Sequence, residues 1–304
     1  MKARRKEVVM ELKPYLKERC KIVDKALNEF LPAARTRPKT IHEAMRYSLF
    51  AGGKRLRPIL CLAAAEACDS DYKNALAPAS AVECIHTYSL IHDDLPCMDD
   101  DDLRRGVPTS HVKYGEGIAV LAGDALLTIA FEILAKTPAT QRYDVGAYIS
   151  ELAVASGSRN LIGGQVADLE GEGSDILLSP PQLKFIHQSK TAALLTASTR
   201  LGGMTADATP KKIEALTIYG QSLGLAFQVI DDILDVTQTS EKLGKSAGKD
   251  EATAKSTFPA LFGLEKSRQK AAQLTRKAHD ALKPFGKKAD RLHEIADYLL
   301  DRDY

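Results

Sequence analysis

The stretch Ile91–Gly106 reads IHDDLPCMDDDDLRRG, with six aspartates in ten residues and then, after one leucine, two arginines. It follows residues 76–90, LAPASAVECIHTYSL, an apolar segment with the spacing of a helix. The C-terminal end of a helix carries partial negative charge, so aspartates there are unfavourable unless a cation compensates them. Pro96 turns the chain after this helix, which lets Asp93 and Asp99 point into one space. The stretch therefore predicts a cation-binding site at the end of an apolar helix.

A second acidic motif repeats this arrangement. Residues 227–235 read FQVIDDILD, and Asp231 and Asp235 stand four apart on one helix face, where they repel each other unless a metal lies between them. Positive charges form compact motifs of their own, in GGKRLRP at 52–58 and at Arg104-Arg105. Carboxylates do not bind phosphate directly, but Mg²⁺ accepts both carboxylate and phosphate oxygens, and arginine and lysine grip phosphate themselves. The pattern indicates diphosphate substrates whose apolar tails lie along the apolar helices.

The rest of the chain predicts an all-α protein. Of its 304 residues, 44% are hydrophobic, which is enough for a sizeable core. Nearly every long segment has helical periodicity, glycine and proline fall mostly between these segments, and no strand alternation bounded by turns is evident. No Gly/Ser-rich or acidic linker divides the chain. We expect one domain over residues 1–304, a large helical bundle whose central helices are buried on all sides.

Composition excludes several other classes. The 42 Lys+Arg balance 40 Asp+Glu, which gives no general attraction to nucleic acid or to an anionic membrane. The five cysteines form no CxxC pair, so neither a disulfide framework nor a zinc site is expected, and a reducing cytoplasm is the simplest compartment. The N-terminus is basic but contains glutamates and lacks the apolar core of a secretory signal. We also expect no integral membrane segment.

The motifs resemble those of a known family. DDLPCMD followed by DDLRRG, and later DDILD, resemble the two aspartate-rich motifs of the short-chain trans-prenyl diphosphate synthases. GGKRLRP, HTYSLIHDD, LAGDALL, GGQVADLEGE, HQSKTAALL and KSTFPALFGL match that family in order, over about residues 40 to 265. The resemblance implies an isoprenoid-synthase bundle around a deep central cavity, usually in a homodimer. It also implies head-to-tail elongation, in which an allylic diphosphate ionises and isopentenyl diphosphate attacks the cation.

The resemblance implies roles for particular residues. Mg²⁺, as three ions replaceable by Mn²⁺, is expected on Asp93, Asp94, Asp99, Asp231, Asp232 and Asp235. The allylic diphosphate is expected on Arg104, Lys190, Thr191, Gln228, Lys245 and Lys255, and isopentenyl diphosphate on Lys54, Arg57, His86 and Arg105. The residues expected to act in catalysis are Asp93, Lys190, Gln228 and Asp231, with Gln165 and Asp168 as a polar pair near the reacting carbons. For Asp100 we expect a solvated loop, and no role is assigned to His92 or His187.

Product length is predicted from the helix below Asp93. At about 100° per residue, Val82, His86 and Ser89 fall on the Asp93 stripe, whereas Tyr88 falls about 140° away. Ideal geometry therefore places Tyr88 off the path of a growing tail. In the family, however, a bulky aromatic residue five positions before the first aspartate is typical of farnesyl (C15) enzymes from bacteria. We therefore expect Tyr88 and Ser89 to set the chain length and the product to be farnesyl diphosphate.

Other functions remain as alternatives. The first is a geranylgeranyl (C20) diphosphate synthase, a relative that tends to carry a smaller residue at the position of Tyr88. A class I terpene cyclase shares the fold and the first motif, but usually carries an Asn/Ser/Glu second motif in place of DDILD. An inactive synthase-like subunit is expected to lose aspartates from one motif, and both are intact here.

Overall fold

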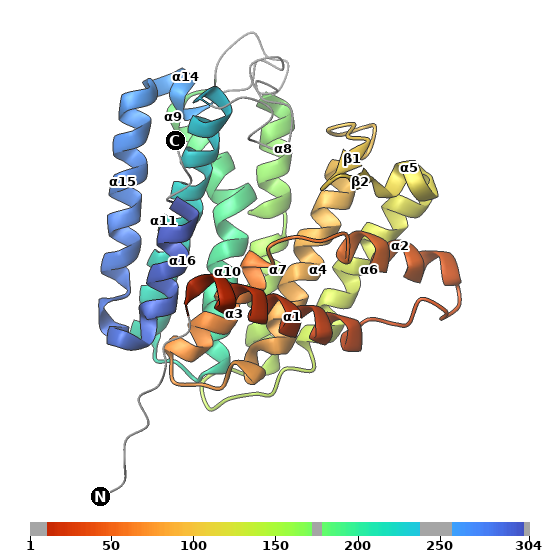
Figure 1. Ribbon diagram of the computed structural model, residues 1–304, viewed down its shortest axis with the longest axis horizontal. Coiled ribbons are helices and arrows are strands. Elements are labelled where there is room, and N and C mark those ends of the chain that lie inside the picture. Colours follow the sequence, from red (N-terminus) through yellow and green to blue (C-terminus); the bar gives the residue numbers. More distant parts are fainter. Residues whose placement is uncertain (1–10, 172–177, 238–256, 301–304) are drawn as a thin grey trace, which may run out of the picture.

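The computed structural model describes residues 11–171, 178–237 and 257–300, and these form a helical bundle (Figure 1). The elements, in order, are α1 Leu12–Phe30, α2 Lys39–Leu49, α3 Leu56–Ala67, η1 Tyr72–Ala75, α4 Leu76–Asp93, β1 Leu103–Arg104, β2 Val107–Pro108, α5 Ser110–Tyr114, α6 Glu116–Leu134, α7 Val145–Ser156, α8 Leu161–Gly171, α9 Pro180–Ile186, η2 His187–Ala192, α10 Ala193–Thr205, α11 Pro210–Thr237, α14 Phe258–Phe262, α15 Leu264–Ala281, η3 Lys283–Ala289 and α16 Asp290–Leu300. The prediction of an all-α protein is confirmed.

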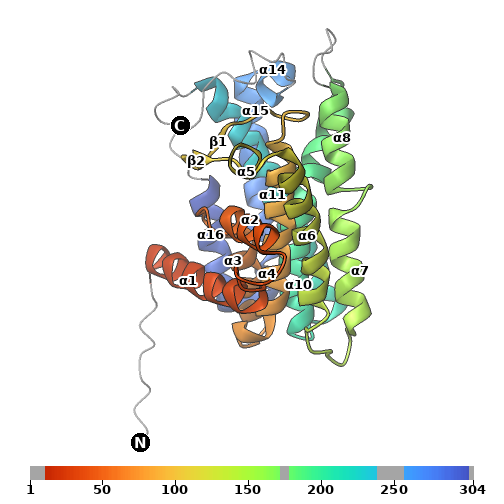
Figure 2. The same cartoon turned by 90° about the vertical axis from the view of Figure 1, so that its right-hand side faces the viewer.

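The long helices run roughly parallel to one axis, while α1 and α2 cross the bundle (Figures 1 and 2). Helices α3, α4 and α10 form its interior, where small residues allow close approach. A Cβ on Gly202 of α10 would come within 2.0 Å of the Cys61 carbonyl oxygen of α3, so only glycine permits this packing. The apolar segments predicted from the sequence therefore become the buried centre of the bundle.

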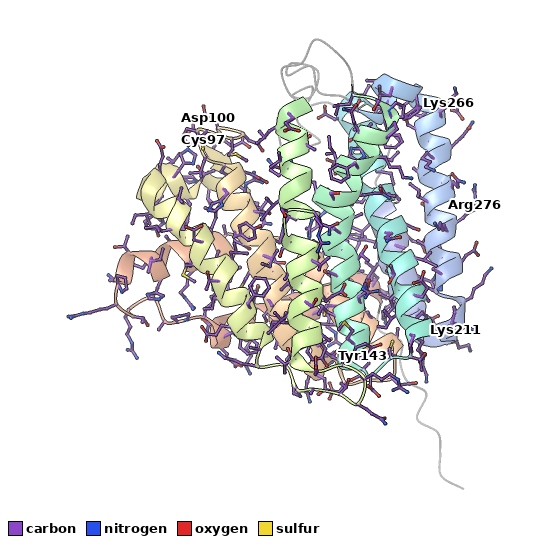
Figure 3. All side chains as sticks on the ribbon, turned by 180° about the vertical axis from the view of Figure 1, so that it is seen from behind. Cys97, Asp100, Tyr143, Lys211, Lys266 and Arg276 are labelled. Atoms are coloured by element: carbon purple, nitrogen blue, oxygen red, sulfur yellow. The ribbon has the colours of Figure 1, made fainter. Side chains whose placement is uncertain are left out.

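Two helices that carry the acidic motifs end at the same end of the bundle. Helix α4 ends at Asp93, and α11 runs in the same direction through Asp231 and Asp235 (Figure 1). Figure 3 shows Cys97 and Asp100, which follow α4, at this end, and Lys211, near the start of α11, at the opposite end. We call the first of these the acidic end.

One small β-hairpin was not expected from the sequence. Strands β1 and β2 pair antiparallel, with Arg104 opposite Val107. The two loop residues, Arg105 and Gly106, have φ of 54° and 78°, the left-handed values that a tight two-residue hairpin turn requires. Two-residue strands are too short to show an alternating pattern, which is why the periodicity did not reveal them.

Helix α6 has the length and composition of a membrane span, with a mean hydropathy of 1.9 over its most apolar window, although 44% of that window is buried within the bundle. The sequence analysis did not single out this segment, because Glu116, Asp124 and Glu132 interrupt its apolar run. A core helix of a bundle has the same composition, so this is weak evidence for a membrane segment.

Candidate active site

The end of α4 and the hairpin together form a group of carboxylates, Asp93, Asp94 and Asp99, which we call the first acidic wall. Asp94 is buried, and one of its carboxylate oxygens accepts from Arg104 Nε at 2.6 Å and lies 2.5 Å from Arg104 Nη2. The chain between them folds back on α4, because the Asp99 backbone N–H donates to the Asp93 carbonyl at 2.8 Å. Arg104 is thus held by Asp94, and the predicted role of Asp94 as a metal ligand stays a prediction.

The Asp93 side chain lies beside these groups and has no hydrogen bond or ion pair with the described part of the chain. Burial raises its pKa to about 6, Asp99 and Asp94 add to the increase, and Lys190 and Arg104 oppose it. A partly buried carboxylate next to two others is favourable when ionised only if more positive charge arrives. Among the described residues, Asp93 is therefore a carboxylate without a paired cation.

Next to this wall lies a basic cluster of Arg57, His86 and Arg105, which we call the positive pocket. Arg57 Nη1 donates to His86 Nε2 at 3.3 Å, and the buried Arg57 Nε has no partner among the described residues. The pKa of His86 lies well below its usual value, first because of burial and then because of Arg57, Arg105 and Arg104. Burial likewise lowers the pKa of Arg57 to about 10. This concentration of donors and positive charge suits an anion with several oxygens.

The glycine pair in GGKRLRP holds one side of this pocket. The Arg105 guanidinium donates to the Gly52 carbonyl, and a Cβ on Gly53 would lie 2.5 Å from Arg105 Nη1. Gly53 has a φ of 126°, so both its backbone and the guanidinium above it require glycine. Lys54, by contrast, is exposed, with Nζ 5.9 Å from the Tyr298 ring centre.

A π-helical segment lies between α8 and α11. Residues 187–192 form this turn, a type of irregularity often found at functional sites. Lys190 Nζ donates to Asp168 Oδ2 at 2.6 Å. Helix α8 can approach this closely because residue 164 is a glycine: a Cβ added there would lie 2.4 Å from the backbone nitrogen of Lys190. Thr191 Oγ1 donates to Gln228 Oε1 at 3.0 Å. One short segment therefore contacts both α8 and α11.

The second acidic motif is placed by a stripe of residues four apart on α11. Gly220 and Gly224 let α11 approach α10 and the π-helical turn, since a Cβ on Gly224 would lie 2.5 Å from Cα of Ala192. Gln228 Nε2 then donates to Asp232 Oδ1 at 3.2 Å, and Asp232 Oδ2 accepts from the Phe258 N–H at 2.9 Å. Asp232 is buried in this network. Its predicted metal contact is untested, and its observed contacts are those of a structural residue.

A cavity of about 370 Å³ runs below the first wall, between α4, α8 and the π-helical turn. Both charged and apolar side chains line it. The residues that line it are Arg57, His86, Tyr88, Ser89, Leu90, His92, Asp93, Met98, Leu161, Ile162, Gln165, Val166, Leu169, Lys190, Thr191 and Leu194. Its form matches a diphosphate head with a hydrocarbon tail.

The cavity corrects the ideal-geometry argument about chain length. Tyr88 lines it together with Ser89, whereas Val82 is fully buried and is not among the lining residues. The expectation that Tyr88 lies off the path was wrong, because the cavity wraps around the end of α4. The wall that α8 contributes to the cavity was not predicted from the sequence. Leu161, Gln165 and Leu169 are spaced four apart and so share one helix face, and this spacing could have indicated it.

Four further residues predicted for the site are Lys245, Lys255, Asp231 and Asp235. Lys245 and Lys255 lie outside the described residues. Asp231 is partly buried and Asp235 is buried near the end of α11. Within residues 11–171, 178–237 and 257–300, no three acidic, histidine or cysteine side chains lie close enough to hold an ion by themselves.

The residues at the acidic end nevertheless fit a divalent cation shared with a ligand. Asp93, beside Asp99, offers hard oxygen ligands, and Mg²⁺ usually takes only one or two carboxylates together with phosphate oxygens and water. Such a site is completed by its substrate, so three converging protein ligands are not required. The predicted cation site at the end of α4 is chemically consistent with the geometry.

Comparison with known proteins supplies independent findings. The model of the polyprenyl synthetase family matches residues 38–298. The chain is 50% identical to a chloroplastic geranylgeranyl pyrophosphate synthase of Capsicum annuum, over 100% of this chain and 82% of that protein. It is 48% identical to a geranylgeranyl diphosphate synthase of Cyanophora paradoxa, over 95% and 96%. A crystal structure of an FPP/GFPP synthase from Zymomonas mobilis superimposes with a TM-score of 0.83 at 38% identity, over 95% and 98% of the two chains.

Proposed function

Since the chain belongs to the polyprenyl synthetase family and is a trans-prenyltransferase, we propose that it makes geranylgeranyl diphosphate, the C20 product, from isopentenyl diphosphate and allylic diphosphates. The observation that carries this proposal is one cavity lined both by charged groups, among them Asp93, Arg57 and Lys190, and by apolar side chains. The relatives that are 48–50% identical and named for the C20 product support the chain length. They favour the C20 product over the farnesyl product that was expected from the sequence.

The C15 product is a second candidate because one observation favours it. Tyr88 lines the cavity, and an aromatic ring there shortens the space for a tail. The similar crystal structure is of an enzyme described as an FPP/GFPP synthase, a description that names the C15 product FPP beside the longer GFPP, so it does not decide between the two lengths. The two products differ by one condensation, so the same site performs both reactions.

The positive pocket is the proposed site for isopentenyl diphosphate. Arg57 and Arg105 offer guanidinium donors, and the Arg57 Nε that lacks a partner would donate to a diphosphate oxygen. His86 is neutral, so it adds a donor without further repulsion of the arginines. Lys54 lies at the exposed rim, where its flexible side chain can reach the same anion.

The acidic end is the proposed site for the allylic diphosphate. Asp93, Asp99, Asp231 and Asp235 would hold Mg²⁺, which supplies charge neutralisation for the departing diphosphate. Arg104 and Lys190 are each paired with a carboxylate of the chain and so are already oriented at the mouth. The apolar walls exclude water, which would otherwise quench the allylic cation. The released diphosphate can take the proton lost in the last step.

Product analysis tests this proposal. The protein is incubated with isopentenyl diphosphate, Mg²⁺ and dimethylallyl, geranyl or farnesyl diphosphate, and the dephosphorylated products are separated by chromatography. We expect C20 from all three starters, with no turnover in excess chelator. C15 alone from the first two starters, with farnesyl diphosphate unused, would replace the C20 assignment. Absence of any product would overturn the proposal. Tyr88→Ala should lengthen the product, and an unchanged length would remove Tyr88 from the argument.

We also propose that the chain forms a homodimer through α6, α7 and α8. These neighbouring helices expose large apolar side chains: Val120, Leu121 and Val154, and also Ile162 and Val166, which line the cavity as well. Apolar residues clustered on adjacent elements are typical of a protein interface. Light scattering coupled to size-exclusion chromatography should give twice the mass of the chain, and a monomer would contradict the proposal.

A further inference from the structure

His92 has a defined place in the wall of the cavity, although the sequence suggested no role for it. It lies on the last turn of α4, directly before Asp93, and lines the cavity. Its Nε2 lies 3.0 Å from the carbonyl oxygen of Val120 on α6. Because a carbonyl only accepts, Nε2 must carry the hydrogen of this bond. The bond fixes the ring against α6.

A glycine on α6 makes the space for this ring. A Cβ on Gly123 would lie 2.1 Å from His92 Nε2 and 2.5 Å from its Cδ2. Glycine within a helix costs about 0.5–1 kcal/mol relative to alanine, so a structural reason for it is expected. Here the imidazole occupies the volume that a side chain at position 123 would fill. Gly117, on the same helix, has no atom within 4 Å of its hypothetical Cβ.

The ring of His92 in turn supports Tyr88. The two rings meet edge to face, with centres 5.8 Å apart and planes at 76°. Tyr88 is 5% exposed, and its buried hydroxyl has no hydrogen-bond partner among the described residues. Without such a bond, packing alone holds the Tyr88 ring in its rotamer. His92 is the aromatic partner that packs against it.

We propose that His92 is a positioning residue that sets product length, by holding the Tyr88 ring from its place over Gly123 of α6. The depth of the cavity then depends on a contact between α4 and α6 as well as on the size of residue 88. The inference deepens the proposed function, because its consequence is read in the products of that reaction.

Two substitutions should change the product length in opposite directions. In Gly123→Ala the new methyl group displaces the imidazole toward the cavity and Tyr88. The ratio of the longer to the shorter product should then fall about fivefold or more, equivalent to about 1 kcal/mol in relative barrier. In His92→Ala the support for Tyr88 is lost, and the same ratio should rise by a similar factor. Gly117→Ala is the matched control on α6 and should leave the ratio unchanged.

The double variant tests whether the glycine acts through the histidine. In Gly123→Ala/His92→Ala the methyl group has no imidazole to displace, so its products should equal those of His92→Ala. A Gly123→Ala effect that persists in the double variant would overturn the inference, as would an unchanged product ratio in a folded Gly123→Ala. If His92→Ala does not fold, as judged by circular dichroism, His92→Gln keeps a donor for the Val120 carbonyl without the ring and should also lengthen the product.

This experiment separates the two proposals. Every ratio is measured against the parent protein under the same conditions. If the parent makes C15 alone, the C20 assignment fails, while the opposite shifts of the two variants still test His92. If the parent makes C20 and neither variant changes its products, only the inference about His92 fails.

Discussion

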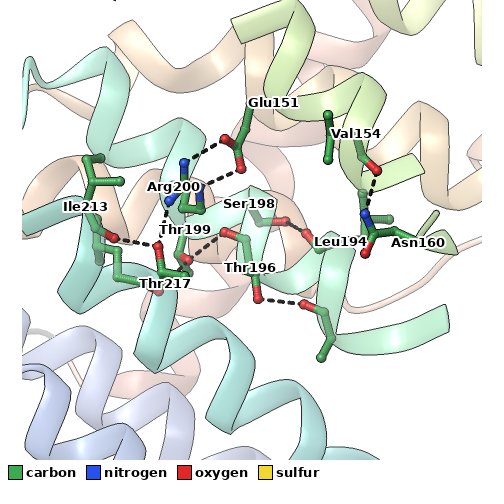
Figure 4. Close-up of polar contacts among 12 residues, drawn as sticks. Glu151, Val154, Asn160, Leu194, Thr196, Ser198, Thr199, Arg200, Ile213 and Thr217 are labelled. Carbon is green, nitrogen blue, oxygen red and sulfur yellow. Dashed lines mark hydrogen bonds and ion pairs between the residues drawn. The ribbon is translucent and has the colours of Figure 1, made fainter. Parts of the chain in front are cut away.

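Two partly buried arginines of the bundle differ in how many of their donors have partners. Arg200 of α10 donates Nε to Glu151 Oε1 at 2.7 Å and Nη2 to Glu151 Oε2 at 2.9 Å, and Nη1 donates to Thr217 Oγ1 at 2.7 Å (Figure 4). This group, which we call the Arg200 network, ties α10 to α7 and α11. Each of its guanidinium nitrogens has a partner within the chain.

Arg57 of α3 lines the cavity and has fewer hydrogen-bond partners than Arg200. One of its nitrogens donates to a neutral histidine, while Nε is buried without a partner among the described residues. Nearby, the Asp93 side chain has no ion pair among the described residues, and its pKa is raised to about 6. Burying unmatched polar groups is costly, so a protein tolerates them where a ligand supplies the missing partner. The comparison distinguishes arginines that hold the fold from groups that await a substrate.

The largest expected effect comes from exchanging an acid in each region. Asp93→Asn should lower kcat by at least about 10²-fold, because a group that stabilises the departing charge is lost. Its melting temperature should not fall, since the change removes a poorly compensated charge. Glu151→Gln in the Arg200 network should do the opposite, with activity kept and stability lowered by about 1–3 kcal/mol. Steady-state kinetics and thermal unfolding of both variants measure the contrast. Equal losses of stability would erase the distinction.

Arg55 and Arg57 allow the same comparison within three residues. Arg55 is 3% exposed and donates to Asp24, Glu83 and the Leu49 carbonyl. Arg55→Gln should therefore destabilise the protein by about 3 kcal/mol, because Glu83 is left buried and unpaired.

Arg57→Gln should raise KM for isopentenyl diphosphate about tenfold or more, the loss of one charged hydrogen bond. Its unfolding midpoint in urea should stay near that of the parent. If Arg57→Gln unfolds as easily as Arg55→Gln, Arg57 is structural and its proposed role is wrong.

A pH titration can sharpen the comparison further. The folded state depresses the pKa of His86 well below 6.5, while the unfolded chain keeps the ordinary value. The unfolded state then binds more protons as pH falls below about 6.5, so stability decreases there. The parent should lose stability between pH 7 and pH 5 more steeply than His86→Gln, as measured by urea unfolding without substrate. Added inorganic diphosphate should reduce the difference, because an anion near His86 favours its charged form. Parallel curves for the two proteins would contradict this.

The smallest effect is expected in the Arg200 network itself. Thr217→Val removes one acceptor of Arg200 while keeping the shape of the side chain, and it should cost about 1 kcal/mol of stability. Activity and product length should not change, because Thr217 does not line the cavity below the acidic wall. Calorimetry and product chromatography on the same sample give both results. A change in product length would mean that the two regions are coupled.

The sequence was sufficient for some parts of the site and insufficient for others. Asp93 was predicted from a run of carboxylates after an apolar helix, and Lys190 and Thr191 from the family resemblance; all three line the cavity, and their roles stay predictions. Asp94 and Asp232 were grouped with the metal ligands, yet one is held by Arg104 and the other by Gln228 and the Phe258 N–H. Adjacent aspartates look alike in a sequence, and only the fold decides which of them turns inward.

By itself, then, the sequence determined an all-helical chain with two acidic motifs near helix ends and separate compact basic motifs. These features depend on local spacing and on the chemistry of the residue types, which a linear pattern records. Only the tertiary structure decided that Tyr88 borders the cavity, that His92 fills the space above Gly123, and that Arg55 and Arg57 have different partners. Such contacts join helices that are distant along the chain, and their geometry is set by how closely the backbones approach, which no local pattern specifies.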